Sequence, residues 1–208
     1  GAGTIGQTTA IGPEQPNDGS YNLVGFCGRL GVDNTDGRVF PRRGFALEVT
    51  GEANRPLYGS DIEHDQVEVD ARQIVTLGRN TVTLTAAAGT SRTEHSVAIP
   101  PFSLGGFGSF SGYRPGRLAG NHYGLAAVHY RFRISDIRSD WGTAIYLGTS
   151  IESAGAWGTV EEITPHDLSY GGSVYLGVNT ALGPVYLAYA RALDSSYGSV
   201  YLLLGRTL

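Results

Sequence analysis

Serine and histidine are the residue types in this chain that could form a hydrolytic site, because a histidine base beside a serine activates its hydroxyl as a nucleophile. The chain has five histidines, which are His64, His95, His122, His129 and His166. Only His122 and His129 fall in a clearly alternating segment, and their odd separation puts them on opposite faces of a strand. No two histidines or carboxylates show the spacing of metal ligands on one rigid element. The sequence therefore predicts no metal site, and it leaves His122 near serine residues as the candidate for a Ser–His pair.

Two glycine-rich motifs look like nucleotide or nucleophile sites, but each lacks part of the required pattern. Gly1–Gly6 reads GAGTIG and matches G-x-G-x-x-G, yet no strand precedes it and no helix follows it. Gly108–Gly112 reads GSFSG, with Phe110 where the G-x-S-x-G elbow has its serine. We therefore expect no catalytic residue and no cofactor, and we expect the protein not to be an enzyme.

The composition excludes two further kinds of site. A formal net charge of −4 argues against nucleic acid as a partner. The single cysteine, Cys27, excludes a disulfide framework and a cysteine-based zinc site. Many Gly and Tyr residues with only 16% charged residues suit an all-β protein with a polar interior and an apolar exterior.

Period-two alternation of apolar side chains runs through almost the whole chain and predicts strands. In the last part of the chain Val174, Leu176 and Val178 take every second place, as do Val200, Leu202 and Leu204. The predicted strands are Asn22–Val32, Arg43–Glu52, Asp65–Val75, Asn80–Gly89, Asn121–Ser135, Trp141–Glu152 and three more between Ser169 and Leu208. No segment of useful length has helical period, so the fold class is all-β.

The connections between these strands alternate between short and long, which is typical of outer-membrane barrels. The link Asp33–Arg42 is the exception, because it falls on the short side and yet has about ten residues. A weak first strand at Thr4–Ile11, within residues 1–20, makes the strand count even. We therefore predict a single domain, residues 1–208, that forms a closed antiparallel transmembrane β-barrel of about ten strands.

The polar side of the predicted strands becomes the lumen of this barrel. The predicted lumenal charges are Glu68, Asp70, Arg72, Arg131, Arg133 and Glu152. We expect charges of both signs to pair across a narrow interior rather than to leave a wide pore. A soluble sandwich is the alternative, but it would expose these charges and bury the apolar face.

Residues 97–134 carry a family resemblance. The segment VAIPPFSLGGFGSFSGYRPGRLAGNHYGLAAVHYRFRI resembles the inward-folding loop and following strand of the outer-membrane assembly and secretion barrels, also called the bacterial surface antigen family. The resemblance implies that residues 97–120 fold into the lumen, with Phe110, Ser111, Gly112 and Tyr113 at the loop motif and Arg114 after it. Ser111 replaces the arginine with which that motif reaches the barrel wall. The family barrel usually has 16 strands, so the chain could instead be the C-terminal part of a larger barrel.

A narrower resemblance points to a function. The motifs SGY-x-PG-x-L-x-GNHYGL, YLG-x-S-x-E-x-G-x-W and LGPVYLAYA are similar to the C-terminal barrel of patatin-like type V secretion proteins. This resemblance implies a translocator or anchor for a domain attached at the N-terminus. A stand-alone small barrel with a structural or interaction role is the first alternative, and an outer-membrane lipid hydrolase that uses His122 is the second.

The end of the chain resembles the assembly signal that the barrel-insertion machinery reads. Ser196, Gly198, Tyr201 and Leu203 fit the pattern, and Leu208 stands where the terminal aromatic residue is usual. The partners that we expect are therefore the lipid bilayer of the bacterial outer membrane and the insertion machinery, with homo-oligomerisation left open.

Overall fold

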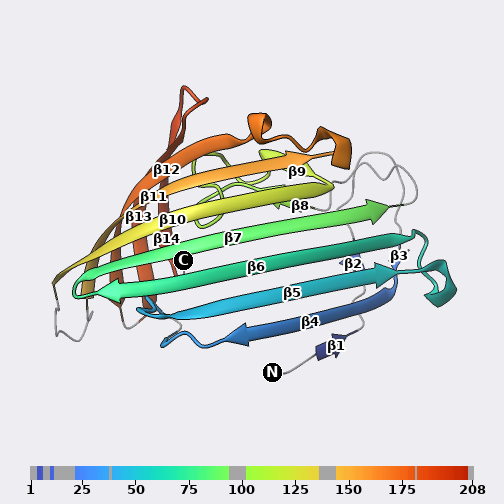
Figure 1. Ribbon diagram of the computed structural model, residues 1–208, viewed down its shortest axis with the longest axis horizontal. Coiled ribbons are helices and arrows are strands. Elements are labelled where there is room, and N and C mark those ends of the chain that lie inside the picture. The colour runs from blue at the N-terminus through green and yellow to red at the C-terminus, as the bar shows by residue number, and fades with distance from the viewer. Residues whose placement is uncertain are drawn as a thin grey trace.

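A computed structural model describes residues 4–6, 10–11, 22–37, 39–93, 102–135, 144–180 and 182–205. Its main feature is one antiparallel sheet of ten strands, in the order β1-β4-β5-β6-β7-β10-β11-β12-β13-β14 (Figure 1). The strands are β1 (Thr4–Gly6), β4 (Gly25–Asp33), β5 (Gly44–Asn54), β6 (His64–Leu77), β7 (Asn80–Thr93), β10 (His122–Ser135), β11 (Ala144–Trp157), β12 (Ser169–Thr180), β13 (Gly183–Ala192) and β14 (Gly198–Leu204). The predicted all-β class and the count of ten strands are confirmed.

Two short strand pairs accompany the main sheet. Strand β2 (Ala10–Ile11) pairs with β3 (Asn22–Leu23), and β8 (Phe102–Leu104) pairs with β9 (Leu118–Gly120). Single 3-10 turns occur at Pro56–Tyr58, Val160–Glu162 and Pro165–Asp167. None of the helices in the described ranges is long and apolar enough to cross a membrane.

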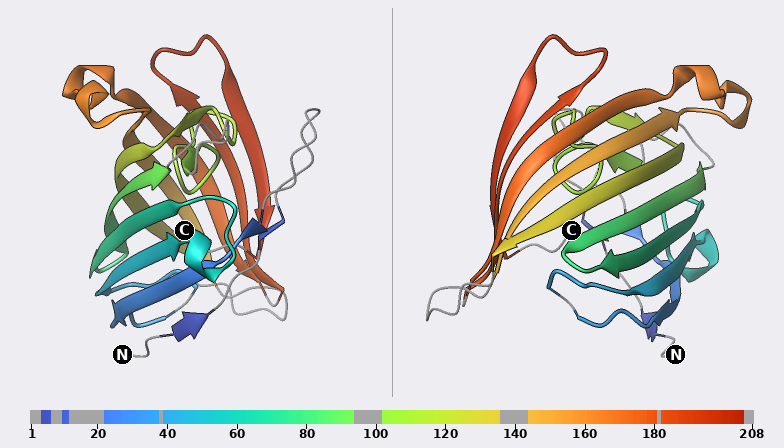
Figure 2. Two further views of the ribbon diagram at one scale, coloured as in Figure 1. Left: turned by 90° about the vertical axis from the view of Figure 1, so that its right-hand side faces the viewer. Right: turned by 60° about the vertical axis from the view of Figure 1, so that its left-hand side comes forward.

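The predicted first strand is divided in the structure. Of the segment Thr4–Ile11, only β1 joins the main sheet, where Ile5 lies opposite Gly28 of β4. The sheet is strongly curved, so that β4–β6 face β12–β14 across the concave side (Figure 2). Among the described residues no ladder joins β1 to β14, and closure of the barrel at this seam stays a prediction.

Several strands run further than their apolar pattern predicted. Strand β7 continues to Thr93 rather than Gly89, and β11 continues to Trp157 rather than Glu152. Small residues such as Ala154 and Gly155 interrupt the apolar alternation there, but the backbone ladder continues because Ala154 pairs with Leu125 and Gly155 with Gly124. The first residues of the predicted strand Trp141–Glu152 lie outside the described ranges.

The alternation separates an exposed apolar face from a packed interior face. On β12, Val174 and Leu176 are exposed while Ser173 and Tyr175 are buried. Strands β13 and β14 repeat this arrangement with Leu187 and Leu202 outside. A sheet whose apolar residues face outward and whose interior is polar or small is the arrangement that lipid requires.

Link lengths agree with the predicted asymmetry. The link between β6 and β7 is only Gly78 and Arg79, whereas residues 55–63 and 158–168 form longer links at the other end of the sheet. The link between β10 and β11, residues 136–143, lies outside the described residues. The link between β4 and β5 is long although it belongs to the short-link end, as the sequence indicated.

Two neighbouring positions on β7 test the assignment of the faces. Leu84 is exposed on the outer face, and Thr85 lies on the interior face. We expect Leu84→Arg to prevent membrane insertion, because an arginine facing lipid near the midplane costs about 2–4 kcal/mol.

Thr85→Arg is the matched control and should insert, because its charge reaches the polar interior. The measurement is the amount of heat-modifiable barrel in purified outer membranes. Equal loss of folded barrel for both variants would contradict a lipid-facing outer surface.

Candidate functional site: a lumenal loop held by the barrel wall

The segment Phe102–Gly120, here called the lumenal loop, lies on the concave side of the sheet (Figure 2). The hairpin β8–β9 forms its base, and its tip doubles back through the hydrogen bond from the Gly106 amide to the Tyr113 carbonyl at 2.8 Å. Gly105 and Gly106 have φ of +132° and +88°, which side chains rarely adopt, so glycine permits this reversal. The loop therefore presents the segment Phe110–Tyr113 to the wall.

Ser111 is the centre of the contact between the loop and the wall. Its amide donates to Oε2 of Glu152 at 2.6 Å, and its hydroxyl donates to Oε1 at 2.5 Å. The Ser150 hydroxyl donates to the same Oε1 at 2.6 Å. Glu152 is 1% exposed and has no ion pair among the described residues, so these donors are what satisfies its carboxylate. One residue thus supplies two donors to two oxygens, as an arginine fork would.

The neighbours of Ser111 fit a wall of small residues. Phe110 is 0% exposed and packs in a cluster with Ala154 and Ala192. A Cβ on Gly112 would lie 2.6 Å from the backbone nitrogen of Ala192, so the loop main chain approaches β13 as closely as glycine allows. A Cβ on Gly171 would meet the Phe110 ring at 3.2 Å. The small side chains of β11, β12 and β13 therefore form the seat of the loop.

Two tyrosines complete the attachment. The Tyr201 hydroxyl of β14 lies 2.9 Å from the Ser111 carbonyl and 3.1 Å from the Tyr113 carbonyl, and donates to these main-chain acceptors. The Tyr113 hydroxyl contacts Ser169 and donates to the Asp194 carboxylate. Burial raises the pKa of the Tyr113 hydroxyl, and its hydrogen bond to Asp194 acts in the same direction, so it keeps its proton at neutral pH. The loop motif is therefore bonded to β11, to β12 and to β14.

Comparison with known proteins identifies the family. The family model described as the Omp85 superfamily domain matches residues 5–199. The chain belongs to the Omp85 superfamily. Its fold resembles the crystal structure of BamA from Haemophilus ducreyi lacking POTRA domains 1-3, with a TM-score of 0.70 and 14% sequence identity.

That alignment covers 92% of this chain and 44% of the BamA chain, so the chain spans less than half the length of that structure. None of the curated proteins matches the chain. Membership of the Omp85 superfamily places this protein in the bacterial outer membrane.

The predicted loop residues occupy different environments in this Omp85 barrel. Phe110, Ser111 and Gly112 are buried against the wall, Tyr113 is half-buried, and Arg114 is exposed. Ser111 lacks the guanidinium of the family motif, and the sequence did not reveal that its amide and hydroxyl would bind Glu152 instead. One feature of the sequence could have indicated this contact. Glu152 is a carboxylate on the lumenal side of β11, and no cation lies near it in that strand.

Two of the predicted lumenal charges, Arg131 and Glu152, are not paired with opposite charges across the interior as expected. Glu152 accepts hydrogen bonds from serines, and Arg131 lies against aromatic rings. Glu68 accepts a hydrogen bond of 2.5 Å from the Tyr123 hydroxyl. The expectation of charge pairing across the lumen is therefore wrong for Arg131 and Glu152. Segments that lie between the opposite walls supply their hydrogen-bond partners instead, which are the Pro41 carbonyl for Arg131 and Ser111 for Glu152.

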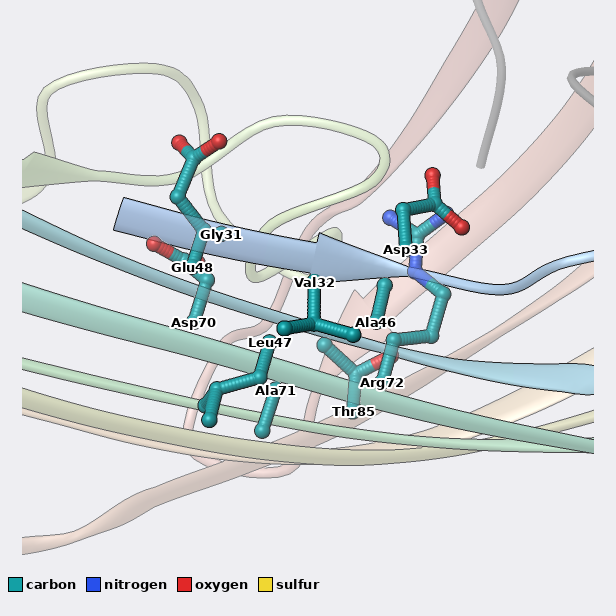
Figure 3. A pocket seen from close by; sticks show the side chains of 10 residues that line it. All are labelled: Gly31, Val32, Asp33, Ala46, Leu47, Glu48, Asp70, Ala71, Arg72 and Thr85. Atoms are coloured by element: carbon teal, nitrogen blue, oxygen red, sulfur yellow. The ribbon is translucent and has the colours of Figure 1, made fainter. Parts of the chain in front are cut away.

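A hollow of about 430 Å³ lies beside the first strands of the main sheet. Its lining comes from β4 to β7 and includes Glu48, Asp70 and Arg72 (Figure 3). The carboxylates of Glu48 and Asp70 project to one side of the sheet, and Leu47 and Ala71 project to the other (Figure 3). Arg133 lies on the same interior-facing phase of β10 as Arg131.

The closing strand has residues with two different environments. Tyr201 and Leu203 face inward, where they pack beside a buried cluster, and Val200, Leu202 and Leu204 are exposed on the outer face. Ser196 precedes β14 in an exposed link, Gly198 begins the strand, and Leu208 lies outside the described residues. Recognition of this strand by the insertion machinery stays a prediction.

The histidines do not gather into a hydrolytic site in the described ranges. Nδ1 of His122 lies 2.8 Å from the Thr90 hydroxyl, and His129 lies on the opposite face of β10. The described residues contain no group of three His, Cys, Asp or Glu side chains that could hold a metal ion.

A double-mutant cycle tests the contact at Ser111. We expect Ser111→Ala and Glu152→Gln each to lower the free energy of unfolding by about 1–3 kcal/mol, since each leaves a buried polar group poorly satisfied. The two effects should be strongly non-additive, with a coupling energy of about 1–2 kcal/mol, because the residues share two hydrogen bonds.

The measurement is urea unfolding of the purified barrel in lipid vesicles. The pair Ser111→Ala and Thr76→Ala, on different parts of the wall, is the control and should be additive. Additive losses for Ser111→Ala and Glu152→Gln would show that the two residues do not interact.

Gly112→Val tests the close approach of the loop to β13. The added side chain would overlap the Ala192 backbone, so we expect the loop to leave its seat. Trypsin should then cleave after Arg117 about tenfold faster than in the unmodified protein, because cleavage follows the population of the open loop.

Ala119→Val, at an exposed position of β9, is the matched control and should leave the cleavage rate unchanged. An unchanged rate in Gly112→Val would mean that the main chain is not held against Ala192.

Proposed function

We propose that this Omp85 barrel anchors, and helps to expose, a domain attached on its N-terminal side, as in patatin-like type V secretion proteins. The sequence motifs shared with those proteins support the proposal, and they recur in the same order through most of the chain. The barrel itself contributes an apolar outer surface for lipid and a loop that partly fills the interior.

The observation that carries this proposal is the unequal filling of the interior. The lumenal loop is bonded to β11, to β12 and to β14, whereas the hollow whose lining includes Glu48, Asp70 and Arg72 lies over β4–β7. A polypeptide crossing the membrane must have its backbone polar groups solvated or hydrogen-bonded. The polar side chains on the wall of β4–β7 could form hydrogen bonds with a crossing polypeptide. The lumenal loop could then stay bound to the opposite wall.

We also propose that the insertion machinery recognises β14 through its backbone edge. The last ladder of the described sheet pairs β13 with β14, so the other edge of β14 has backbone groups that can add a strand. The outward Val200, Leu202 and Leu204 would then enter lipid as the strand is released.

The secretion role is tested with a reporter domain joined ahead of Gly1. We expect the reporter to become accessible to protease added outside intact cells. Glu152→Gln should reduce this accessibility severalfold at an equal amount of folded barrel. The substitution weakens the contact with Ser111 that holds the lumenal loop beside the proposed route of the polypeptide.

Leu84→Arg, which should not insert, is the control for reporter released by cell lysis. A reporter that stays protected while the barrel is folded in the outer membrane would rule out the secretion role and favour a stand-alone barrel.

A further inference from the structure

We propose that the turn between β4 and β5, of which residues 34–37 and 39–43 are described, is a second plug of the barrel interior. In this plug the Phe40 ring fills the interior, and Arg131 holds the ring in place. The proposal rests on the interior contacts and on Omp85 membership, not on the secretion role. It concerns the end of the sheet opposite the long links, where a barrel turn needs only a few residues.

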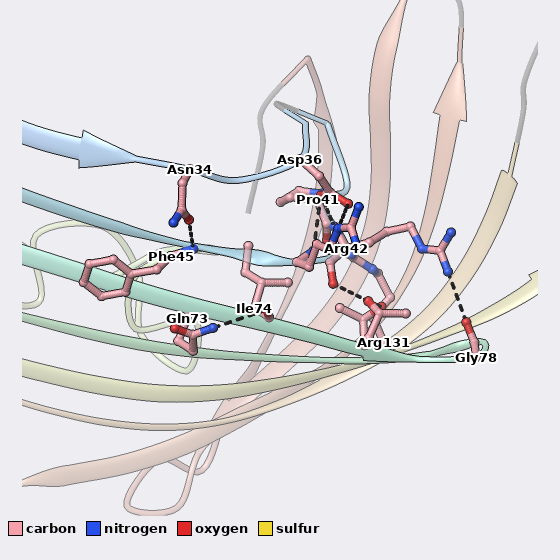
Figure 4. A network of polar contacts seen from close by, with 12 residues as sticks. Asn34, Asp36, Pro41, Arg42, Phe45, Gln73, Ile74, Gly78 and Arg131 are labelled. Carbon is pink, nitrogen blue, oxygen red and sulfur yellow. Dashed lines mark hydrogen bonds and ion pairs between the residues drawn. The ribbon is translucent and has the colours of Figure 1, made fainter. Parts of the chain in front are cut away.

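Hydrogen bonds within the turn fix its conformation (Figure 4). The Asn34 side chain accepts a hydrogen bond from the Phe45 amide at 2.6 Å, and the Asp36 carboxylate accepts from the amides of Arg42 and Arg43. At Gly44, φ is +127°, and a Cβ there would lie 2.5 Å from the Thr35 backbone. These contacts bring the two ends of the turn together and direct the segment between them away from the sheet.

The base of the turn is also tied to the neighbouring link. The Thr76 hydroxyl donates to the Arg42 carbonyl at 2.5 Å, and the Arg42 guanidinium donates to the Gly78 carbonyl at 3.3 Å (Figure 4). The β5 side of the turn is therefore held against the end of β6 and the link that follows it.

The tip crosses the interior to the opposite wall. The Phe40 ring stacks on Tyr146 of β11 with ring centroids 4.4 Å apart, and it lies 5.3 Å from the ring of Tyr186 of β13. Strands β5 and β13 are separated in the sheet by β6, β7, β10, β11 and β12, so this contact spans the concave space. Phe40 is 5% exposed, whereas the adjacent Val39 is 38% exposed.

The backbone of Phe40 shows that the ring is placed there against a local preference. Its φ is +48°, the left-handed region that bulky residues seldom occupy. Such a conformation persists where surrounding contacts determine it, and it is found at clamps and switch regions. In this turn those contacts are the interior rings and Arg131.

Arg131 of β10 holds the tip by two kinds of interaction. Its guanidinium carbon lies 5.2 Å from the centroids of both Phe40 and Tyr146, and Nη2 donates to the Pro41 carbonyl at 2.6 Å. Arg131 is buried, and its Nε has no hydrogen-bond partner in the described residues. A buried cation that depends on the rings and on one carbonyl favours the inserted position of the turn.

The turn and the lumenal loop meet on the same tyrosine. Phe107 of the lumenal loop lies 5.9 Å from the Tyr186 ring and packs in the same cluster as Phe40. The two plugs therefore approach one ring from different segments. Loss of either one leaves the other to close this part of the interior.

Ion conductance in planar lipid bilayers tests the plug, with potassium chloride as the probe. We expect Phe107→Ala to conduct weakly and Phe40→Ala/Phe107→Ala to conduct at least threefold more, because the second change removes the Phe40 ring as well. Val39→Ala/Phe107→Ala is the matched control and should equal Phe107→Ala. Heat-modifiability on gels identifies the folded protein for each variant.

Arg131→Gln in the Phe107→Ala background is the second test, because it keeps the turn and a hydrogen-bond donor but removes the cation. We expect conductance above that of Phe107→Ala and more frequent opening events. This variant decides the question if Phe40→Ala fails to fold. Conductance equal to that of Phe107→Ala in the folded Phe40 or Arg131 variants would overturn the proposal and make the turn a permanent brace.

Discussion

Backbone pairing in lipid is the constraint on which the rest of this structure depends. Every N–H and C=O group that faces hydrocarbon must find a partner within the sheet, so the long ladders from β4 to β14 are required whatever the side chains do. The side chains of each strand then point either outward to lipid or inward to the lumen. The apolar set goes outward, and whatever remains must form a stable interior without water-free gaps or unsatisfied groups.

At Glu152 and Arg131 the interior solves this problem with chain segments rather than with opposite charges. A loop brought into the lumen carries its own main-chain donors and acceptors, and each plug finds a complementary group on the wall. Glu152 accepts from the Ser111 amide, Tyr201 donates to two carbonyls of the lumenal loop, and Arg131 donates to the Pro41 carbonyl. Small residues on the wall, such as Ala192, then let these backbones approach within hydrogen-bonding distance.

Much of the sheet could be predicted from the sequence, because period two and link length are local properties. Val174 and Leu202 were assigned to the outer face by their spacing alone, and both are exposed. The partners of Ser111 could not be predicted in this way, since Glu152 is 41 residues distant in the chain and the pair depends on how the loop enters the lumen. The sequence showed that the link Asp33–Arg42 is long for the short side, but not that Phe40 would cross to β13.

Ser111 stands where the loop motif of the family has arginine, and this difference changes how the contact between the loop and the wall can break. An arginine has a long, flexible side chain, so its guanidinium can follow a carboxylate while the loop backbone shifts. Ser111 binds Glu152 through its own amide and a short hydroxyl, and hydrogen bonds weaken steeply once the distance grows. A small displacement of the loop therefore breaks both bonds together and exposes a buried carboxylate to water. The Ser150 hydroxyl then remains as a donor to Glu152, so a displaced loop leaves the carboxylate only partly satisfied.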